Sequence, residues 1–134
     1  MSETVASVRA KAKVLVVEDE GSVRDALMRI LASYGHTVVG AEDGEAALAV
    51  YEAEVGFQIV MTDLSLPGKS GWDVARAIRK KDPDIPIVLL SGWDVDESGD
   101  EYRGSGVSRL LPKPVKIKEM LALVDELVHK VTEG

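Results

Sequence analysis

The chain contains no cysteine among its 134 residues, which excludes disulfide bonds and thiolate chemistry. Aromatic residues make up only 4%, and no apolar run has the length of a membrane span or the apolar core of a signal peptide. Basic residues are outnumbered, with 16 Lys and Arg against 23 Asp and Glu, and the net charge of −7 argues against direct binding to nucleic acid. We therefore expect a cytoplasmic protein without direct nucleic-acid or membrane contact.

The remaining composition is that of a globular protein, with 46% apolar and 29% charged residues. The length fits one domain with a core of useful size. Residues 1–12 are polar with scattered Val and Ala, so we expect a flexible tail or linker there. The domain itself is expected over residues 13–132.

Short aliphatic runs alternate with segments of helical spacing five times. The runs lie at 13–17, 37–41, 57–63, 86–90 and 107–111, and the helices are predicted over 22–34, 44–54, 70–81, 94–106 and 115–131. Buried strands in this alternation indicate an α/β fold, a doubly wound five-stranded parallel sheet with helices on both faces. The segment 94–106 contains three glycines and five acids, so a short or mobile helix is expected there.

Polar side chains follow four of the five predicted strands, namely Glu18-Asp19, Asp63, Ser91 and Lys113. The carboxyl ends of parallel strands share one edge of the sheet, where ligands bind at the point of reversed strand order. Three carboxylates there repel one another, and Mg²⁺ is the cation that suits such an all-oxygen cluster. Asp63 then fits a phosphoryl acceptor, with Lys113 neutralising charge on the transferred group and the Ser91 hydroxyl donating to it.

Four motifs occur in order, one at each of these strand ends. They are Val-Val-Glu-Asp-Glu at 16–20, Met-Thr-Asp-Leu-Ser-Leu-Pro at 61–67 with Ser-Gly at 70–71, Leu-Leu-Ser-Gly at 89–92 and Leu-Pro-Lys-Pro at 111–114. With these motifs the chain resembles the receiver domain of two-component response regulators (CheY-like), over nearly all of residues 13–131. The resemblance implies a flavodoxin-like three-layer sandwich with strand order 2-1-3-4-5.

The resemblance also implies roles for single residues. Asp63 is the phosphoacceptor for a histidine kinase or histidine phosphotransfer protein. Asp19 and Asp63 ligate Mg²⁺ directly, Glu18 acts through water, and the backbone carbonyl of Ser65 completes the protein ligands. Ser91 is the switch hydroxyl, and Lys113 pairs with the phosphoryl group and precedes a cis peptide bond. The output partner, whose identity the resemblance does not give, is expected on the face formed by residues 94–131.

Two positions depart from the family pattern. Glu18 stands where Asp is commoner, and Glu is an accepted variant with a longer reach. Leu110 stands where Tyr or Phe is frequent, three residues before the lysine, so coupling of the switch hydroxyl to an aromatic ring is not expected. We hypothesise instead that phosphorylation orders or shifts the segment 92–106.

Each site residue also has an ordinary structural explanation. Asp63 alone is compatible with a loop acid or a helix cap, Ser91 with a turn serine and Lys113 with a solvated lysine. These explanations become less convincing when the residues are taken together, because each of them stands at the end of a different predicted strand. Glu20 suits a solvated first helical turn and is left out of the site.

The alternative function is a Mg²⁺-dependent phosphatase with an aspartyl nucleophile. That class needs a second Asp two residues after the first as general acid, and Ser65 stands there. A flavodoxin-like binding module is a third possibility, but acids at the strand ends would repel a flavin phosphate. The Gly-Lys-Ser run at 68–70 resembles the end of a P-loop, yet Asp63 replaces the first glycine of that pattern. We expect a signalling switch, not an enzyme, with only self-phosphorylation and self-dephosphorylation at Asp63.

Four further residues lie outside the motifs or at their margins. Trp72 is expected to pack in the core or at its rim, and Trp93 to cover the site or contact a partner. His36 and His129 are expected at the surface.

Overall fold

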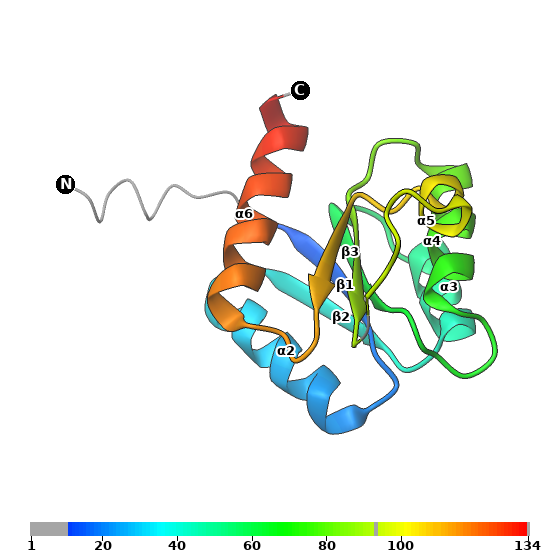
Figure 1. The fold of residues 1–134 in the computed structure, drawn as a ribbon. Helices are drawn as coiled ribbons and strands as arrows, with labels where there is room; N and C mark the ends of the chain where they lie inside the picture. Colours follow the sequence, from blue (N-terminus) through cyan, green and yellow to red (C-terminus); the bar gives the residue numbers. More distant parts are fainter. Residues whose placement is uncertain (1–10, 93, 134) are drawn as a thin grey trace.

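The computed structural model describes residues 11–92 and 94–133 (Figure 1). Most of the predicted tail, residues 1–10, and the predicted role of Trp93 lie outside the described residues, as does the side chain of His129. Within the described part, none of the helices is both long and apolar enough to cross a membrane.

Five parallel strands form one sheet in the order β2-β1-β3-β4-β5, which confirms the predicted order. The strands are β1 (Lys13–Val17), β2 (Thr37–Ala41), β3 (Ile59–Asp63), β4 (Ile87–Ser91) and β5 (Arg109–Pro112), and the helices are α2 (Gly21–Ser33), α3 (Gly44–Ala53), α4 (Gly71–Lys81), α5 (Asp100–Ser105) and α6 (Ile117–Glu133). Helices α2 and α6 cover one face of the sheet, and α3, α4 and α5 lie on the other (Figure 1).

The strands alternate their side chains between two cores, one on each face of the sheet. In β1, Val14 and Val16 join the core under α2 and α6, and Leu15 and Val17 join the core under α3 and α4. All five residues of β3 are buried, because this central strand is covered on both faces. The hydrophobic runs in the sequence are therefore two-sided strands, as predicted.

Side-chain caps explain where two helices begin. The Asp43 carboxylate accepts the backbone N–H of Ala46 at 2.8 Å and starts α3. Ser70 and Asp73 form a reciprocal capping box at the start of α4, so this helix begins at the end of the Asp63 loop as predicted. Helix α2 starts at Gly21, one residue before its predicted start, and Glu20 occupies the capping position without a side-chain cap.

The predicted bounds of some strands and helices were also wrong. Strand β3 begins at Ile59, because Phe57 stacks on Tyr51 with ring centroids 5.9 Å apart and precedes the ladder. Helix α6 begins at Ile117, two residues after its predicted start, and the Ile117 side chain is 48% exposed. Tyr34, the last residue of the predicted helix, lies beyond the end of α2 and is 58% exposed.

The prediction of a surface position for His36 was wrong. Its Nδ1 accepts the backbone N–H of Ala12 at 3.1 Å, and the imidazole is half-buried. Burial lowers the pKa of His36, the nearby charge of Lys11 lowers it further, and Asp125 opposes the shift. Ala12 is 3% exposed and packs in the core, although the sequence had assigned it to the tail.

Candidate functional site

The ends of four strands, β1, β3, β4 and β5, and the residues just after them lie at one edge of the sheet. In the strand register Val17 pairs with Thr62, Asp63 with Leu90, and Ser91 with Pro112. The backbone N–H of Lys113 donates to the carbonyl of Ser91 at 2.8 Å. The parallel order of the strands therefore brings together polar residues that are up to 95 positions apart in sequence.

Three carboxylates meet at this edge. One carboxylate oxygen from each of Glu18, Asp19 and Asp63 lies within 4.8 Å of the others. Glu18 is 1% exposed and Asp63 is 5% exposed, whereas Asp19 is exposed to solvent. The predicted convergence of the three acids is confirmed by this geometry.

One ammonium group bridges the two buried carboxylates. Lys113 Nζ lies 3.1 Å from Asp63 Oδ2 and 3.2 Å from Glu18 Oε1. The second oxygen of Glu18 accepts the backbone N–H of Glu20 at 3.1 Å, so both oxygens of Glu18 are engaged. Lys113 itself is half-buried, and the Lys113-Pro114 peptide bond is cis.

The pKa values of Glu18 and Lys113 are both raised, for different physical reasons. Burial raises the pKa of Glu18, the charge of Asp63 raises it too, and hydrogen bonds from Glu20 and Lys113 partly offset these effects. Burial opposes the charge on Lys113, but the hydrogen bonds to Asp63 and Glu18 outweigh it and raise the lysine pKa. Lys113 therefore stays protonated at neutral pH and balances one of the carboxylate charges.

The donor set fits a hard divalent cation. Three carboxylates and one ammonium leave a formal charge of −2, and every candidate ligand atom of the cluster is an oxygen. Asp19 is the exposed member, so the cluster is open to water on that side. The residues present can therefore hold a metal ion of charge +2 that keeps several waters.

Two contacts that hold the site have no counterpart in the sequence motifs. Arg24 Nη1 donates to the backbone carbonyl of Glu18 at 2.8 Å, and the hydroxyl of Thr62 donates to the carbonyl of Asp63 at 3.0 Å. Both are side-chain bonds to backbone, which no spacing rule marks. Their effect is to hold the backbone that presents the two buried carboxylates.

A groove of about 680 Å³ opens beside the acids. Its lining comprises Asp19, Leu64, Ser65, Leu66, Pro67, Ser70 and Trp72. Trp72 packs edge-on against Tyr102 with ring centroids 6.4 Å apart, which confirms the predicted rim packing. Ser65 lies in this exposed lining, and metal ligation by its carbonyl stays a prediction.

Ser91 ends β4 and is 6% exposed. It lies one residue beyond Leu90, the register partner of Asp63, and is therefore at the same sheet edge as the carboxylates. Gly92 follows, and a Cβ built there would meet no atom within 4 Å. The space beside Ser91 is consistent with the predicted role of its hydroxyl, which stays a prediction.

The first residue of α4 approaches the end of β3 very closely. A Cβ on Gly71 would lie 2.3 Å from the carbonyl oxygen of Asp63 and 2.8 Å from the Cα of Leu64. Gly71→Ala is therefore expected to lower the free energy of unfolding by about 2–3 kcal/mol, since backbone must move to admit the methyl group. Urea denaturation measures this, with Gly92→Ala as the control that should change stability little. Equal stabilities of the two variants would contradict the close approach.

The fold and the edge residues together define a doubly wound α/β domain with a buried Asp, two further acids and a Lys at the switch point of the sheet. The family described as "Response regulator receiver domain" matches residues 14–125. The chain therefore belongs to the response regulator receiver domain family, a family of signalling switches that receive phosphoryl groups from histidine kinases.

Named relatives agree with this assignment. The chain is 34% identical over 113 residues to the response regulator protein FleR of Pseudomonas aeruginosa, and 35% identical over 130 residues to the sensor kinase CckA of Brucella abortus. These matches cover 84% and 96% of this chain. The chain spans only 24% and 14% of the length of those two curated relatives.

Solved structures show the same fold. The chemotaxis protein CheY4 of Vibrio cholerae matches with a TM-score of 0.81 at 28% identity, over 88% of this chain and 99% of that one. A response regulator receiver protein from Pseudomonas putida matches with a TM-score of 0.78 at 33% identity, over 89% of this chain and 99% of that one.

Proposed function

We propose that Asp63 accepts a phosphoryl group from a histidine kinase or histidine phosphotransfer protein and that the acyl phosphate switches partner binding. The observation that carries the proposal is the position of the Asp63 carboxylate. It is buried, lies 3.1 Å from the Lys113 ammonium and is within 4.8 Å of two further carboxylates. A buried acid with one cation and an open cation site is suited to phosphoryl transfer.

In the proposed reaction an Asp63 oxygen attacks phosphorus, and the bond from phosphorus to the donor imidazole nitrogen breaks. Lys113 neutralises charge on the transferred oxygens, and the Ser91 hydroxyl donates a hydrogen bond to one of them. Asp19 and Asp63 directly, Glu18 through water and the Ser65 carbonyl would hold Mg²⁺. The metal, when bound, neutralises the negative charge of the phosphoryl oxygens.

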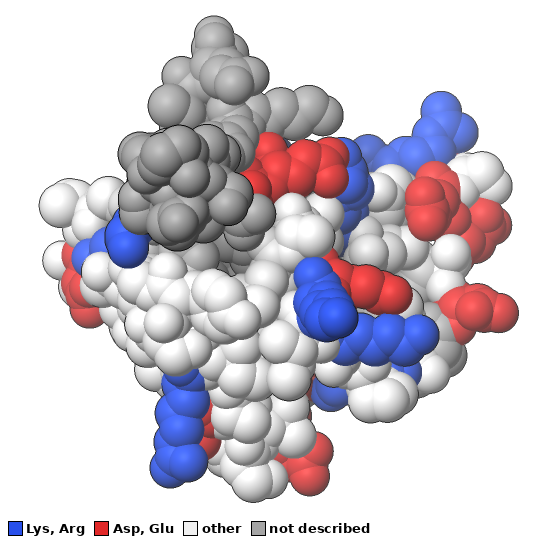
Figure 2. All heavy atoms as spheres, turned by 90° about the vertical axis from the view of Figure 1, so that its left-hand side faces the viewer, with Lys and Arg blue, Asp and Glu red and all other residues white. Residues whose placement is uncertain are grey.

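The proposed phosphodonor contacts the face formed by α2 and α6. Figure 2 views the molecule from this side and shows a continuous uncharged area with charged side chains around it. Helix α2 begins two residues after Asp19, so this face adjoins the acid cluster. A donor is expected in the cytoplasm, where we also place this domain, and the output partner is expected on the α5–β5–α6 face.

The test is phosphorylation by a small donor. Incubation with Mg²⁺ and acetyl phosphate is expected to add one phosphoryl group to the intact mass of the chain, and EDTA is expected to prevent it. Hydroxylamine should remove the group, since it cleaves acyl phosphates. No mass increase, or steady turnover of p-nitrophenyl phosphate that favours the phosphatase alternative, would overturn the proposal.

The segment 92–106 is expected to respond to phosphorylation. Helix α5 covers only six residues, which confirms the expectation of a short helix, and a hollow of about 280 Å³ lies between this segment and β5. Ser91, Val95 and Leu110 are among its lining residues, so a shift of the segment has space beside the switch hydroxyl.

Beryllofluoride with Mg²⁺ is therefore expected to change hydrogen exchange across 92–106 by severalfold, since this short helix depends on few contacts. Exchange in α3 serves as the internal control and should change little. Unchanged exchange across 92–106 would contradict the hypothesis that this segment carries the switch.

A further inference from the structure

Helix α5 is held against α4 by side chains from a single face of α4. Trp72, Arg76 and Arg79 follow one another at helical spacing on that face. Trp72 packs edge-on against Tyr102, and Arg76 pairs with Glu101 at 3.3 Å. A helix of six residues is not stable alone, so these contacts determine where α5 lies.

Arg79 makes the third contact, at the end of α5. Its Nε and Nη2 donate to the carbonyl of Gly106 at 3.1 and 2.6 Å, and its Nη1 donates to the carbonyl of Asp82 at 3.1 Å. All these acceptors are neutral backbone oxygens. Among the described residues no carboxylate pairs directly with Arg79, and the Asp82 carboxylate is occupied by the backbone N–H groups of Asp84 and Ile85.

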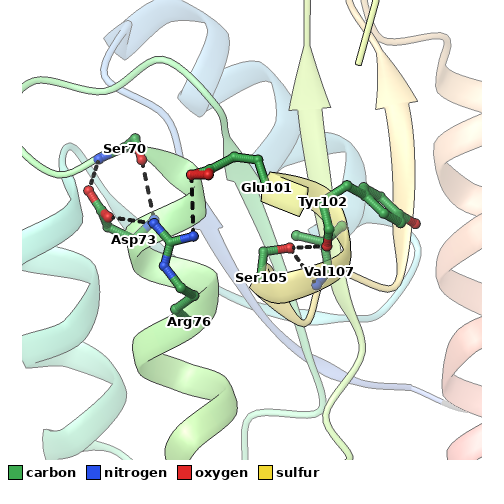
Figure 3. Close-up of polar contacts among 7 residues, drawn as sticks. All are labelled: Ser70, Asp73, Arg76, Glu101, Tyr102, Ser105 and Val107. Atoms are coloured by element: carbon green, nitrogen blue, oxygen red, sulfur yellow. Dashed lines mark hydrogen bonds and ion pairs between the residues drawn. The ribbon is translucent and has the colours of Figure 1, made fainter. Parts of the chain in front are cut away.

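Figure 3 shows the different situation of Arg76. Its guanidinium lies between the carboxylates of Asp73 and Glu101, which balance its charge. Lys80, one position after Arg79, is exposed and makes no ion pair within the described part of the chain. The charges of Asp82 and Asp84 act on Arg79 without forming an ion pair with it. Arg79 and Lys80 are therefore two neighbouring cations without a direct carboxylate contact among the described residues, on a chain whose net charge is −7.

A hollow of about 220 Å³ lies between the two helices at this point, lined by Arg76, Arg79, Lys80, Gly104 and Ser105. A Cβ on Gly104 would meet no atom within 4 Å, so the missing side chain keeps the hollow open. The hollow is smaller than the roughly 300–1,000 Å³ of typical small-molecule sites. It has the size for one side chain of a partner.

We infer that this notch between α4 and α5 binds an acidic segment of a partner protein, with one apolar side chain in the hollow and carboxylates on Arg79 and Lys80. Charge complementarity carries the inference, because among the described residues no carboxylate forms an ion pair with Arg79 or Lys80, while the chain as a whole is acidic. The surface lies outside the acid cluster and does not require phosphorylation. Its test is therefore independent of the proposed phosphoryl transfer.

The experiment measures fluorescence anisotropy of a fluorescein-labelled peptide of alternating Glu and Leu, against the same peptide with Gln for Glu. The Glu peptide is expected to bind the wild-type chain, and the Gln peptide to bind about tenfold more weakly. Lys80→Glu reverses the charge of one of the two cations, and Gly104→Leu fills the hollow. Each is expected to weaken binding of the Glu peptide about tenfold. The control Lys118→Glu, an exposed site on α6, should leave it unchanged.

Circular dichroism melts establish that each variant is folded before its binding is measured. Equal binding of both peptides, or binding that neither notch variant weakens, would overturn the inference. The inference would also be overturned if a labelled single-stranded oligonucleotide bound to the wild-type chain and lost affinity in the same variants as the Glu peptide. A dimer of the chain that Lys80→Glu dissociates would assign the notch to a second copy and overturn it too.

Discussion

Asp63→Ala is expected to abolish phosphorylation by acetyl phosphate completely, with no label on any other residue. The two neighbouring acids cannot replace Asp63. Both oxygens of Glu18 are engaged by Lys113 and Glu20, and Asp19 is exposed and has no hydrogen bond to Lys113 among the described contacts. Only Asp63 combines burial, an ammonium partner and a place at the end of the central strand.

Intact mass spectrometry with Mg²⁺ and acetyl phosphate measures this result. Asp63→Asn, which keeps the size of the side chain, should lose the label as fully as Asp63→Ala. Glu20→Gln is the matched control, because Glu20 lies beside the cluster but contributes only its backbone N–H. Residual labelling of Asp63→Ala would place the nucleophile on another carboxylate.

Lys113→Met is expected to lower the free energy of unfolding by about 2–3 kcal/mol at neutral pH. The change leaves Glu18 and Asp63 buried without their shared cation, and removal of one partner of a buried pair costs several kcal/mol. Lys113 is 25% exposed on its side chain, so the effect is placed below that of a fully buried pair. Exposed Lys118→Met should change stability by less than about 0.5 kcal/mol.

Urea denaturation with a double-mutant cycle isolates the pair. Asp63→Asn combined with Lys113→Met should recover about 1–2 kcal/mol relative to the sum of the single changes, since one of the two uncompensated charges is gone. Millimolar Mg²⁺ should reduce the difference in the free energy of unfolding between wild type and Lys113→Met, because a divalent cation replaces the missing positive charge. Additive single effects would mean that the ammonium does not hold Asp63.

Much of the fold could be predicted from the sequence because the burial of a parallel strand requires a pattern that the sequence shows directly. Parallel strands that are buried on both faces need continuous aliphatic runs. The runs Val14 to Val17 and Ile59 to Met61 are of this kind, and they form β1 and β3. The acids and Lys113 were placed correctly because the ends of parallel strands must share an edge. Which oxygen contacts the ammonium could not be predicted, since that depends on rotamers.

The wrong predictions come from hydrogen bonds that sequence patterns do not reveal. Helix α5 starts at Asp100 instead of Asp94, because Asp96 accepts hydrogen bonds from the backbone N–H and the hydroxyl of Ser98 and forms a turn that competes with a helix. His36 was misplaced because its partner is a backbone N–H at Ala12, 24 positions away. The contacts of Arg79 with the end of α5 were not predicted for the same reason, since they join a side chain to the distant backbone of Gly106.

The bond from Lys113 to Glu18 joins residues 95 positions apart, one just beyond the first strand and the other just beyond the last. During synthesis the acids emerge from the ribosome long before the lysine. A nascent chain that stops short of residue 113 has the carboxylates without their ammonium, and one that stops short of residue 109 also lacks β5. The three carboxylates and their ammonium are thus brought together only once the chain has folded through residue 113.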